Sequence, residues 1–102
     1  MSEEKVTLQM IKDAQERLKG VAQKTGLSYS NSVSDLAGCE VYLKLENLQR
    51  TGSFKLRGAY NKVASLTPEE REKGVIAASP GNHAPGVALA ASEEGCQSGI
   101  CM

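Results

Sequence analysis

Residues 43–61 read LKLENLQRTGSFKLRGAYN, and this stretch decides the class of fold. Apolar and polar side chains alternate over 41–45, which predicts a strand with one buried face. A turn over 49–52 follows, and Ser53 is a good cap for a helix predicted over 54–65. A strand, a turn and a helix in this order make the first unit of an α/β layer fold.

The residues after this stretch continue the alternation of helices and strands. Residues 67–70, Thr-Pro-Glu-Glu, combine a capping box with proline at the first helical position, which predicts a helix that ends at Gly74. The pattern then predicts a short buried strand over 75–78, a loop over 79–82, a helix over 83–94 and a strand over 97–102. We therefore expect an α/β layer fold with a largely parallel sheet.

An amphipathic helix is predicted upstream, over 7–22, with Thr7 as its cap. Its apolar positions recur every three or four residues, at Leu8, Ile11, Ala14, Leu18 and Val21. Gly26 and the serine-rich residues 28–34 interrupt the pattern. A short helix over 34–37 is then expected to end at Gly38.

The composition is that of an ordinary globular chain of 102 residues, with 12 basic and 12 acidic side chains. No basic stripe is present, so we expect no nucleic-acid partner. The apolar runs are too short to cross a bilayer, and the charged amino terminus lacks the apolar core of a signal peptide. Three scattered cysteines without metal-ligand spacing predict reduced thiols, a cytoplasmic location and no metal site.

The first candidate for chemistry is Lys55, which lies in the first turn of a predicted helix. The positive end of the helix dipole disfavours an ammonium group there, and Arg57 adds a second positive charge nearby. Both effects favour the neutral amine, which is the form that attacks an aldehyde to make a Schiff base. Taken alone, a lysine in such a position is more often a solvated surface charge.

The second candidate is the loop between the last predicted strand–helix pair, where residues 78–84 read ASPGNHA. Such a loop aims backbone N–H groups and a helix amino terminus at one point, which suits a carboxylate or a phosphate. An ordinary turn with Asn82 as the helix cap explains the same residues. His83 alone is likewise more often a surface or capping residue than a catalyst.

Together and in this order, the two segments resemble a known family. Residues 43–61 closely resemble the lysine region of threonine dehydratases, and residues 79–83 resemble the Ser-x-Gly-Asn-His substrate loop of the same enzymes. Serine racemases and other relatives in this pyridoxal-phosphate (PLP) family look similar but less close. The resemblance implies an α/β fold, a partial three-layer parallel-sheet fold of the fold-type II (tryptophan synthase β-like) PLP enzymes. Residues 1–50 would belong to the large domain and residues 51–102 to the truncated start of the small domain.

Carried over residue by residue, the resemblance implies that Lys55 is the Schiff-base lysine for pyridoxal 5′-phosphate and the base that removes the substrate α-proton. Phe54 would pack beside the cofactor ring, and Asn82 would hydrogen-bond the ring hydroxyl. The substrate carboxylate would be lined by Ser79, Gly81, Asn82 and His83. The implied reaction is β-elimination of water from threonine or serine, which leaves a 2-oxo acid (2-oxobutyrate from threonine) and ammonia.

Two positions depart from the family pattern. Position 80 usually carries a small residue with an N–H group and position 85 is usually glutamine, whereas Pro80 and Pro85 stand here. Proline cannot donate a backbone hydrogen bond. Both departures are expected to weaken carboxylate binding.

Three functions remain open at this point. The first is a segment of a PLP-dependent threonine dehydratase, and the second is a relative of serine racemase or serine dehydratase that uses the same lysine and asparagine. The third is a non-catalytic, truncated interaction module. The chain ends within a predicted strand, and the family's glycine-rich phosphate loop lies further along. We therefore expect an amino-terminal fragment that is inactive alone, from a cytoplasmic, homo-oligomeric parent enzyme that acts on small amino acids.

Overall fold

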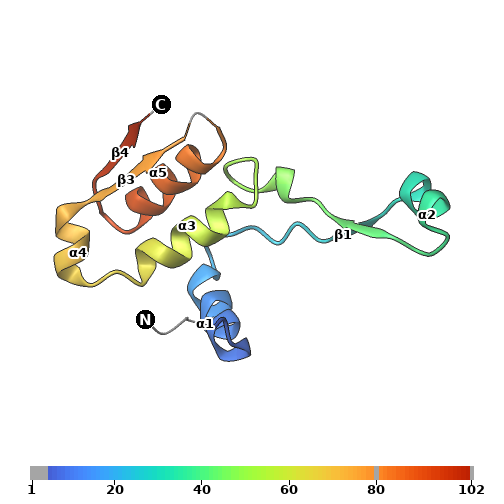
Figure 1. Cartoon of the computed structure of the whole chain (residues 1–102), viewed down its shortest axis with the longest axis horizontal. Helices are drawn as coiled ribbons and strands as arrows, with labels where there is room; N and C mark the ends of the chain where they lie inside the picture. The colour runs from blue at the N-terminus through green and yellow to red at the C-terminus, as the bar shows by residue number, and fades with distance from the viewer. Residues whose placement is uncertain (1–4, 80, 102) are drawn as a thin grey trace.

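Helices α3 (Lys55–Ala64) and α5 (His83–Glu93) lie side by side at the centre of the computed structural model, which describes residues 5–79 and 81–101 (Figure 1). Leu56 in α3 and Ala90 in α5 are completely buried. The main apolar cluster joins the two helices to a neighbouring strand and comprises Ala59, Val63, Ala77, Val87 and Ala90. The core therefore includes residues of α3, the helix that begins at Lys55, and of α5, the helix that follows the asparagine loop.

The two central helices run in the same direction. Near their amino ends, Gly86 of α5 lies against the backbone of Leu56 in α3. Further along, the Tyr60 hydroxyl donates a hydrogen bond of 2.5 Å to Glu94 Oε1, which follows α5. This bond to the Glu94 carboxylate raises the pKa of the Tyr60 phenol. Both helices consequently begin at the same end of the structure.

Strands β3 (Val75–Ala78) and β4 (Ser98–Cys101) form a parallel pair in the register Val75↔Ser98, with α5 as the connection between them. Helix α5 covers one face of this pair (Figure 1). The prediction of two parallel strands here is confirmed, but the prediction that 75–78 is a buried strand is wrong for most of its length. Only Ala77 is buried, and Ile76 is 78% exposed because nothing among the described residues covers the second face.

Helix α4 (Pro68–Lys73) begins as the sequence predicts. The Thr67 side chain accepts from the backbone N–H of Glu70, and the Glu70 carboxylate accepts from the backbone N–H of Thr67. Gly74 ends the helix with a positive φ of 82°. A side chain at Gly74 would also stand 3.0 Å from the carbonyl oxygen of Gln97, so glycine lets the start of β3 lie close to the start of β4.

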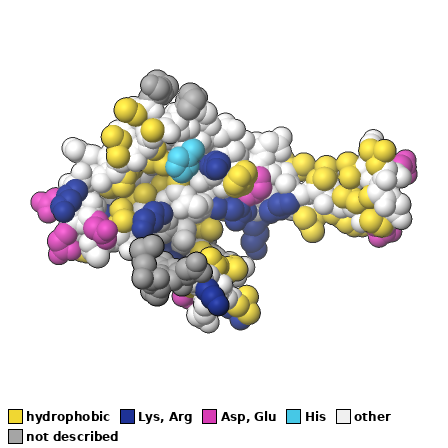
Figure 2. Space-filling model, viewed as in Figure 1, with side chains coloured by type: hydrophobic (Ala, Val, Ile, Leu, Met, Phe, Trp, Pro, Cys, Tyr) yellow, Lys and Arg dark blue, Asp and Glu magenta, His cyan; other side chains and the backbone are white. Residues whose placement is uncertain are grey.

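A slender arm extends away from this core (Figure 1). It consists of β1 (Leu27–Tyr29), α2 (Asn31–Ala37) and β2 (Tyr42–Lys44), with β1 and β2 paired antiparallel. Gly38 ends α2 in the left-handed conformation, as predicted, but α2 begins at Asn31, three residues before the predicted start. Strand β1 was not predicted. The expected buried face of the second strand is also wrong, since β2 is exposed throughout. Figure 2 shows hydrophobic side chains along much of this arm.

Helix α1 (Leu8–Leu18) packs against α3 and begins at the predicted cap, Thr7, whose hydroxyl accepts from the backbone N–H of Met10. It ends four residues before the predicted limit. A single-turn 3-10 helix, η1 (Glu46–Leu48), connects the arm to α3. Within residues 5–79 and 81–101, no helix has the length and apolar character needed to cross a membrane.

The α/β class is confirmed, with one difference in the sheet. The strands of the described residues form two separate pairs, of which β3–β4 is parallel and β1–β2 antiparallel. The antiparallel pair arises because the short β1 folds back across α2, and three-residue strands leave little periodicity for a sequence pattern to detect.

Candidate active site

Lys55 is the first residue of α3, and its side chain is exposed. The turn before it contains Gly52, which has a φ of 77° and donates its N–H to the Gln49 carbonyl at 2.8 Å. Ser53 is buried, and its hydroxyl accepts the backbone N–H of Lys55 at 3.3 Å. The prediction of Ser53 as the helix cap is wrong, because Phe54 occupies the N-cap position and makes no side-chain capping bond. Ser53 holds the first N–H of the helix from one residue further upstream. The turn and the buried serine fix the backbone of Lys55 while its amine stays open to solvent.

Phe54 lies next to this amine. Its ring is 59% exposed, and the Lys55 Nζ atom is 5.2 Å from the ring centroid, a cation–π distance. No carboxylate among the described residues forms an ion pair with Lys55. The amine and the aromatic ring are thus side by side at the surface and free to meet a ligand.

The positive charge of Arg57 is not directed at Lys55, contrary to the expectation from sequence. Arg57 forms an ion pair with Glu46 of η1, and its Nε atom donates to Glu46 Oε1. This guanidinium lowers the pKa of the Glu46 carboxyl from 4.5 to about 2 against the opposing effect of burial, with further help from Gln49 and Thr25. The ion pair balances the Arg57 charge locally. Arg57 therefore acts mainly by fastening the first turn of α3 to η1, and less by adding positive charge near the Lys55 amine.

Glu46 belongs to a small hydrogen-bonded network that holds η1 beneath α3. Thr25 donates to its carboxylate at 3.1 Å and Gln49 at 3.0 Å. Gln49 is itself buried, and its amide pairs with both the N–H and the carbonyl of Gln23, at 3.0 and 2.7 Å. The sequence pattern did not single out Glu46, because its partner lies eleven residues later in the chain. Only the folded turn brings the two together.

The second segment follows the carboxyl end of β3. Ser79 continues the parallel ladder by donating its N–H to the carbonyl of Cys101 at 2.9 Å. Its hydroxyl accepts the N–H of Gly81 at 3.1 Å. Pro80 lies outside the described residues, so the expected effect of proline at that position stays a prediction. The loop is held at its start by the sheet, and it presents Gly81 at the surface.

Asn82 and His83 start helix α5, and both are exposed. Asn82 occupies the N-cap position of α5, as the alternative expects, but its side chain does not make the capping bond. Both side chains stand at the positive end of α5, where a carboxylate or a ring hydroxyl is favoured as a partner.

Packing of α5 against α3 brings the two segments to the same end of the structure. Gly86 lies one helical turn after His83 and touches the backbone of Lys55 and Leu56. In α/β folds, ligands bind outside the carboxyl ends of parallel strands, and the loop after β3 occupies such an end. Lys55, Phe54, Ser79 and residues 81–83 form one candidate active site. This helix contact joins its two segments, and among the described residues no direct bond does so.

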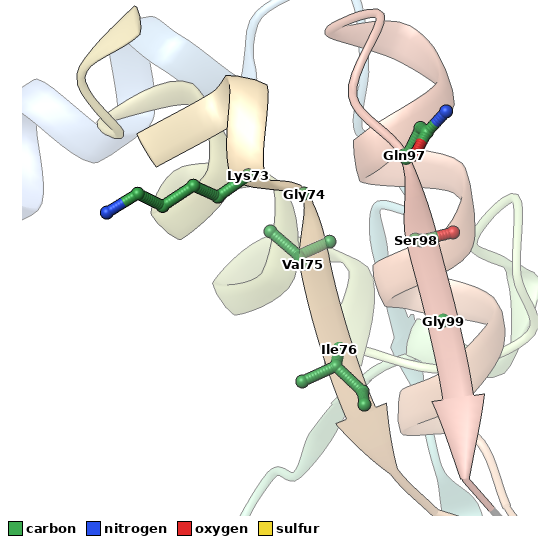
Figure 3. Close-up of a pocket in the computed structure, with 7 residues that line it drawn as sticks. All are labelled: Lys73, Gly74, Val75, Ile76, Gln97, Ser98 and Gly99. Atoms are coloured by element: carbon green, nitrogen blue, oxygen red, sulfur yellow. The ribbon is translucent and has the colours of Figure 1, made fainter. Parts of the chain in front are cut away.

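Two surface pockets lie elsewhere. One, of about 350 Å³, is bounded by the amino ends of β3 and β4 and includes Lys73, Val75 and Gln97 (Figure 3). The other, of about 670 Å³, lies along α1 and the residues that follow it, and it also includes Lys44 of β2 and Arg57 of α3. Neither includes Lys55, Ser79 or residues 81–83. The first pocket lies at the amino ends of the strands, whereas ligands in this fold class bind at the carboxyl ends. The candidate site is therefore located by the chemistry of its residues and by the strand topology.

The residues at this end fit an aldehyde-bearing aromatic cofactor in part. Within the described residues, the Lys55 amine has no ion-pair partner, the Phe54 ring beside it is exposed, and the Asn82 side chain makes no capping bond. Residues that hold the phosphate of such a cofactor are not identified within the described chain. No cluster of metal-ligating side chains occurs in the part that the structure describes.

Comparison with known proteins agrees with this description. The family model described as pyridoxal-phosphate dependent enzyme matches residues 18–102. The L-threonine ammonia-lyase of Thermotoga maritima is 59% identical over 97 residues, which make up 95% of this chain and 24% of that protein.

Two solved structures are similar in fold. The processed form of threonine deaminase isoform 2 from Solanum lycopersicum superposes with a TM-score of 0.79 and 45% identity, over 90% of this chain and 26% of that one. The serine racemase from Dictyostelium discoideum superposes with a TM-score of 0.85 and 43% identity, over 91% of this chain and 30% of that one. The chain thus spans between about a quarter and a third of the length of these proteins.

These matches confirm the predicted fold class and the predicted resemblance, and the cofactor of the matched family is pyridoxal phosphate. The match covers both the lysine segment and the asparagine loop. The chain belongs to the pyridoxal-phosphate dependent enzyme family.

Proposed function

We propose that these residues form the lysine and asparagine-loop part of an enzyme that eliminates water from L-threonine and releases 2-oxobutyrate and ammonia. The observation that carries the proposal is the meeting of two segments at one end of the parallel helices. One is Lys55, whose amine has no ion-pair partner among the described residues, and the other is the loop with Ser79 and residues 81–83. The 59% identity to an L-threonine ammonia-lyase supports threonine as the substrate.

The proposed roles follow from the chemistry of each group. When bound, the cofactor supplies an electron sink for the carbon that loses its proton. The Lys55 amine attaches the cofactor and, when free, takes the α-proton of the substrate, while the β-hydroxyl leaves as water. Phe54 packs beside the ring and Asn82 bonds its hydroxyl. The backbone of Gly81, with Ser79, Asn82 and His83, holds the substrate carboxylate.

Binding of a carboxylate would require one local change in the loop. The Gly81 N–H is engaged by the Ser79 hydroxyl at 3.1 Å, so that hydroxyl must rotate to free it. A serine hydroxyl turns about one bond, and its own hydrogen then serves as a donor to the same carboxylate. The exchange replaces a neutral hydrogen bond by charge-assisted ones, which are about twice as strong.

We infer that residues 1–50 belong to a large domain and residues 51–102 to the start of a small one, which agrees with the close packing among α3, α5, β3 and β4. A cytoplasmic location agrees with three free cysteines. We also propose a homo-oligomeric enzyme with no nucleic-acid or membrane partner.

The decisive test maps the residue that binds the cofactor. Because relatives are three to four times longer, the test uses a hybrid in which this chain replaces the matching segment of the T. maritima L-threonine ammonia-lyase. We expect the hybrid to convert threonine to 2-oxobutyrate, and borohydride reduction followed by peptide mapping to place the pyridoxyl label on Lys55. A label on Lys44 or Lys62, or no turnover, would refute the assignment. Faster turnover or racemisation of serine would favour the serine racemase alternative, which the similarity to that structure supports.

A second test addresses the asparagine loop. In the hybrid, Asn82→Ala should lower turnover roughly tenfold and shift the absorbance of the bound cofactor, because a hydrogen bond to a polar or charged group contributes about 1–3 kcal/mol. Asn47→Ala is the matched control, since Asn47 is exposed in η1 and lies outside the candidate site. If Asn82→Ala behaved like the control in both measurements, the loop would be structural only.

A further inference from the structure

Gly86 occupies a position in α5 where no side chain fits without movement. It is buried, and a Cβ atom built on it would lie 3.2 Å from the Leu56 N atom, 3.3 Å from the Lys55 carbonyl carbon and 3.4 Å from the Leu56 Cα atom. All three are backbone atoms of the first turn of α3. A side chain could rotate away from such a contact, but a helix backbone cannot, so the two helices would have to separate by a few tenths of an ångström.

The requirement for glycine here is one of space. Gly86 is helical and is not among the glycines with positive φ, so other residues can adopt its backbone conformation. Gly58, in α3, offers a direct contrast because it is also helical and a Cβ atom there would meet nothing within 4 Å. The same glycine-to-alanine change therefore improves helix propensity at both positions but creates a contact only at Gly86.

The location of this contact connects it to the candidate site. On α3 it falls on the backbone of Lys55 and Leu56, and on α5 it falls one turn after His83. Deeper in the same interface, Val87 and Ala90 are packed against Ala59 and Val63. Separation forced at Gly86 would therefore act mainly on the site end of the helices, because the buried cluster holds the other end.

We infer that Gly86 is a positioning residue, which sets the distance between Lys55 and the loop over 79–83 by allowing the backbones of α5 and α3 to touch. This inference rests on the proposed function, since it concerns the same site. Reactions that depend on two aligned groups lose rate steeply with small displacements, by about a hundredfold for 1 Å. A shift of a few tenths of an ångström is therefore expected to cost about tenfold in kcat.

The test compares three single variants in the hybrid enzyme loaded with pyridoxal phosphate. Gly86→Ala should lower kcat for threonine about tenfold and shift the absorbance maximum of the bound cofactor. Gly58→Ala should leave kcat within twofold of the unmodified hybrid and should not shift the absorbance maximum. Ala90→Gly removes a buried methyl from the same interface without adding a contact, so it should lower the Tm while leaving kcat and the absorbance maximum unchanged.

The three variants distinguish a displacement of the site residues from a loss of folding stability. A kcat and spectrum for Gly86→Ala like those of Gly58→Ala would overturn the inference, as would a Gly86→Ala protein that fails to fold. A fall in kcat for Ala90→Gly equal to that for Gly86→Ala would also overturn it, because loss of packing alone would then explain both. Failure of the proposed function is recognised separately, since the unmodified hybrid would then lack threonine turnover or carry the borohydride label elsewhere than Lys55.

Discussion

Replacement of Lys55 by alanine is expected to reduce threonine turnover by the hybrid enzyme at least about a thousandfold. One amine is proposed to attach the cofactor and to take the α-proton, and a positioned base alone contributes about 10²–10⁴ in rate. The loss should not reflect unfolding, because the Lys55 side chain is exposed and makes no ion pair among the described residues. Circular dichroism and thermal unfolding of the variant should match those of the unmodified hybrid.

Lys62→Ala is the control for this experiment, since Lys62 is exposed in the last turn of the same helix, away from the candidate site. It should keep full turnover. Addition of methylamine to the Lys55→Ala protein offers a second check, because a small free amine can replace a missing base. Turnover of Lys55→Ala within tenfold of the unmodified hybrid would show that another group carries the chemistry.

A polypeptide of residues 1–102 alone is expected to give no measurable 2-oxobutyrate from threonine. The loop over 79–83 is assigned to the substrate, and no second nest of backbone N–H groups is assigned to the doubly charged cofactor phosphate, which normally needs one. Nothing in residues 5–79 and 81–101 covers the second face of the β3–β4 pair, so Ile76 is 78% exposed and β4 is exposed from Ser98 to Cys101. Such a surface favours self-association.

The measurement adds pyridoxal phosphate and threonine to the purified polypeptide and follows 2-oxobutyrate, with the hybrid enzyme assayed alongside as the positive control. Weak, reversible binding of the cofactor to Lys55 is the most that we expect. Size-exclusion chromatography should report association above the monomer. Turnover near that of the hybrid would contradict this expectation and would mean that a second copy completes the site.

Local features of this fold were predictable because their causes are local. Thr67 and Pro68 start α4 through contacts within one turn, and Gly38 and Gly74 end helices by adopting positive φ. Strand β1 was not predictable in the same way. Its three residues have no usable period, and their pairing with β2 depends on residues fifteen or so positions later. The burial of β3 was overestimated. An apolar sequence pattern indicates that a strand tends to be covered, but the exposure of Ile76 depends on whether another element packs on that face.

In the candidate site, too, the local residue patterns were predictable and the long-range contacts were not. Lys55 and the loop over 79–83 carry recognisable residue patterns, so both were identified before their positions were known. The ion pair of Glu46 with Arg57 and the contact of Gly86 with α3 were not, because each joins residues that the fold alone brings together. Gly86 and Gly58 look alike in sequence, as glycines inside helices. Only the distance to a neighbouring backbone distinguishes them.

The shared direction of α3 and α5 has a consequence for how a substrate arrives. Antiparallel neighbours largely cancel each other's long-range field, but parallel helices that begin together add theirs, with roughly half a positive charge at each amino end. The combined potential extends outward from the end that carries Lys55 and Asn82. An approaching amino acid would be turned carboxylate first before it touches the protein, which raises the productive fraction of encounters and makes association sensitive to ionic strength.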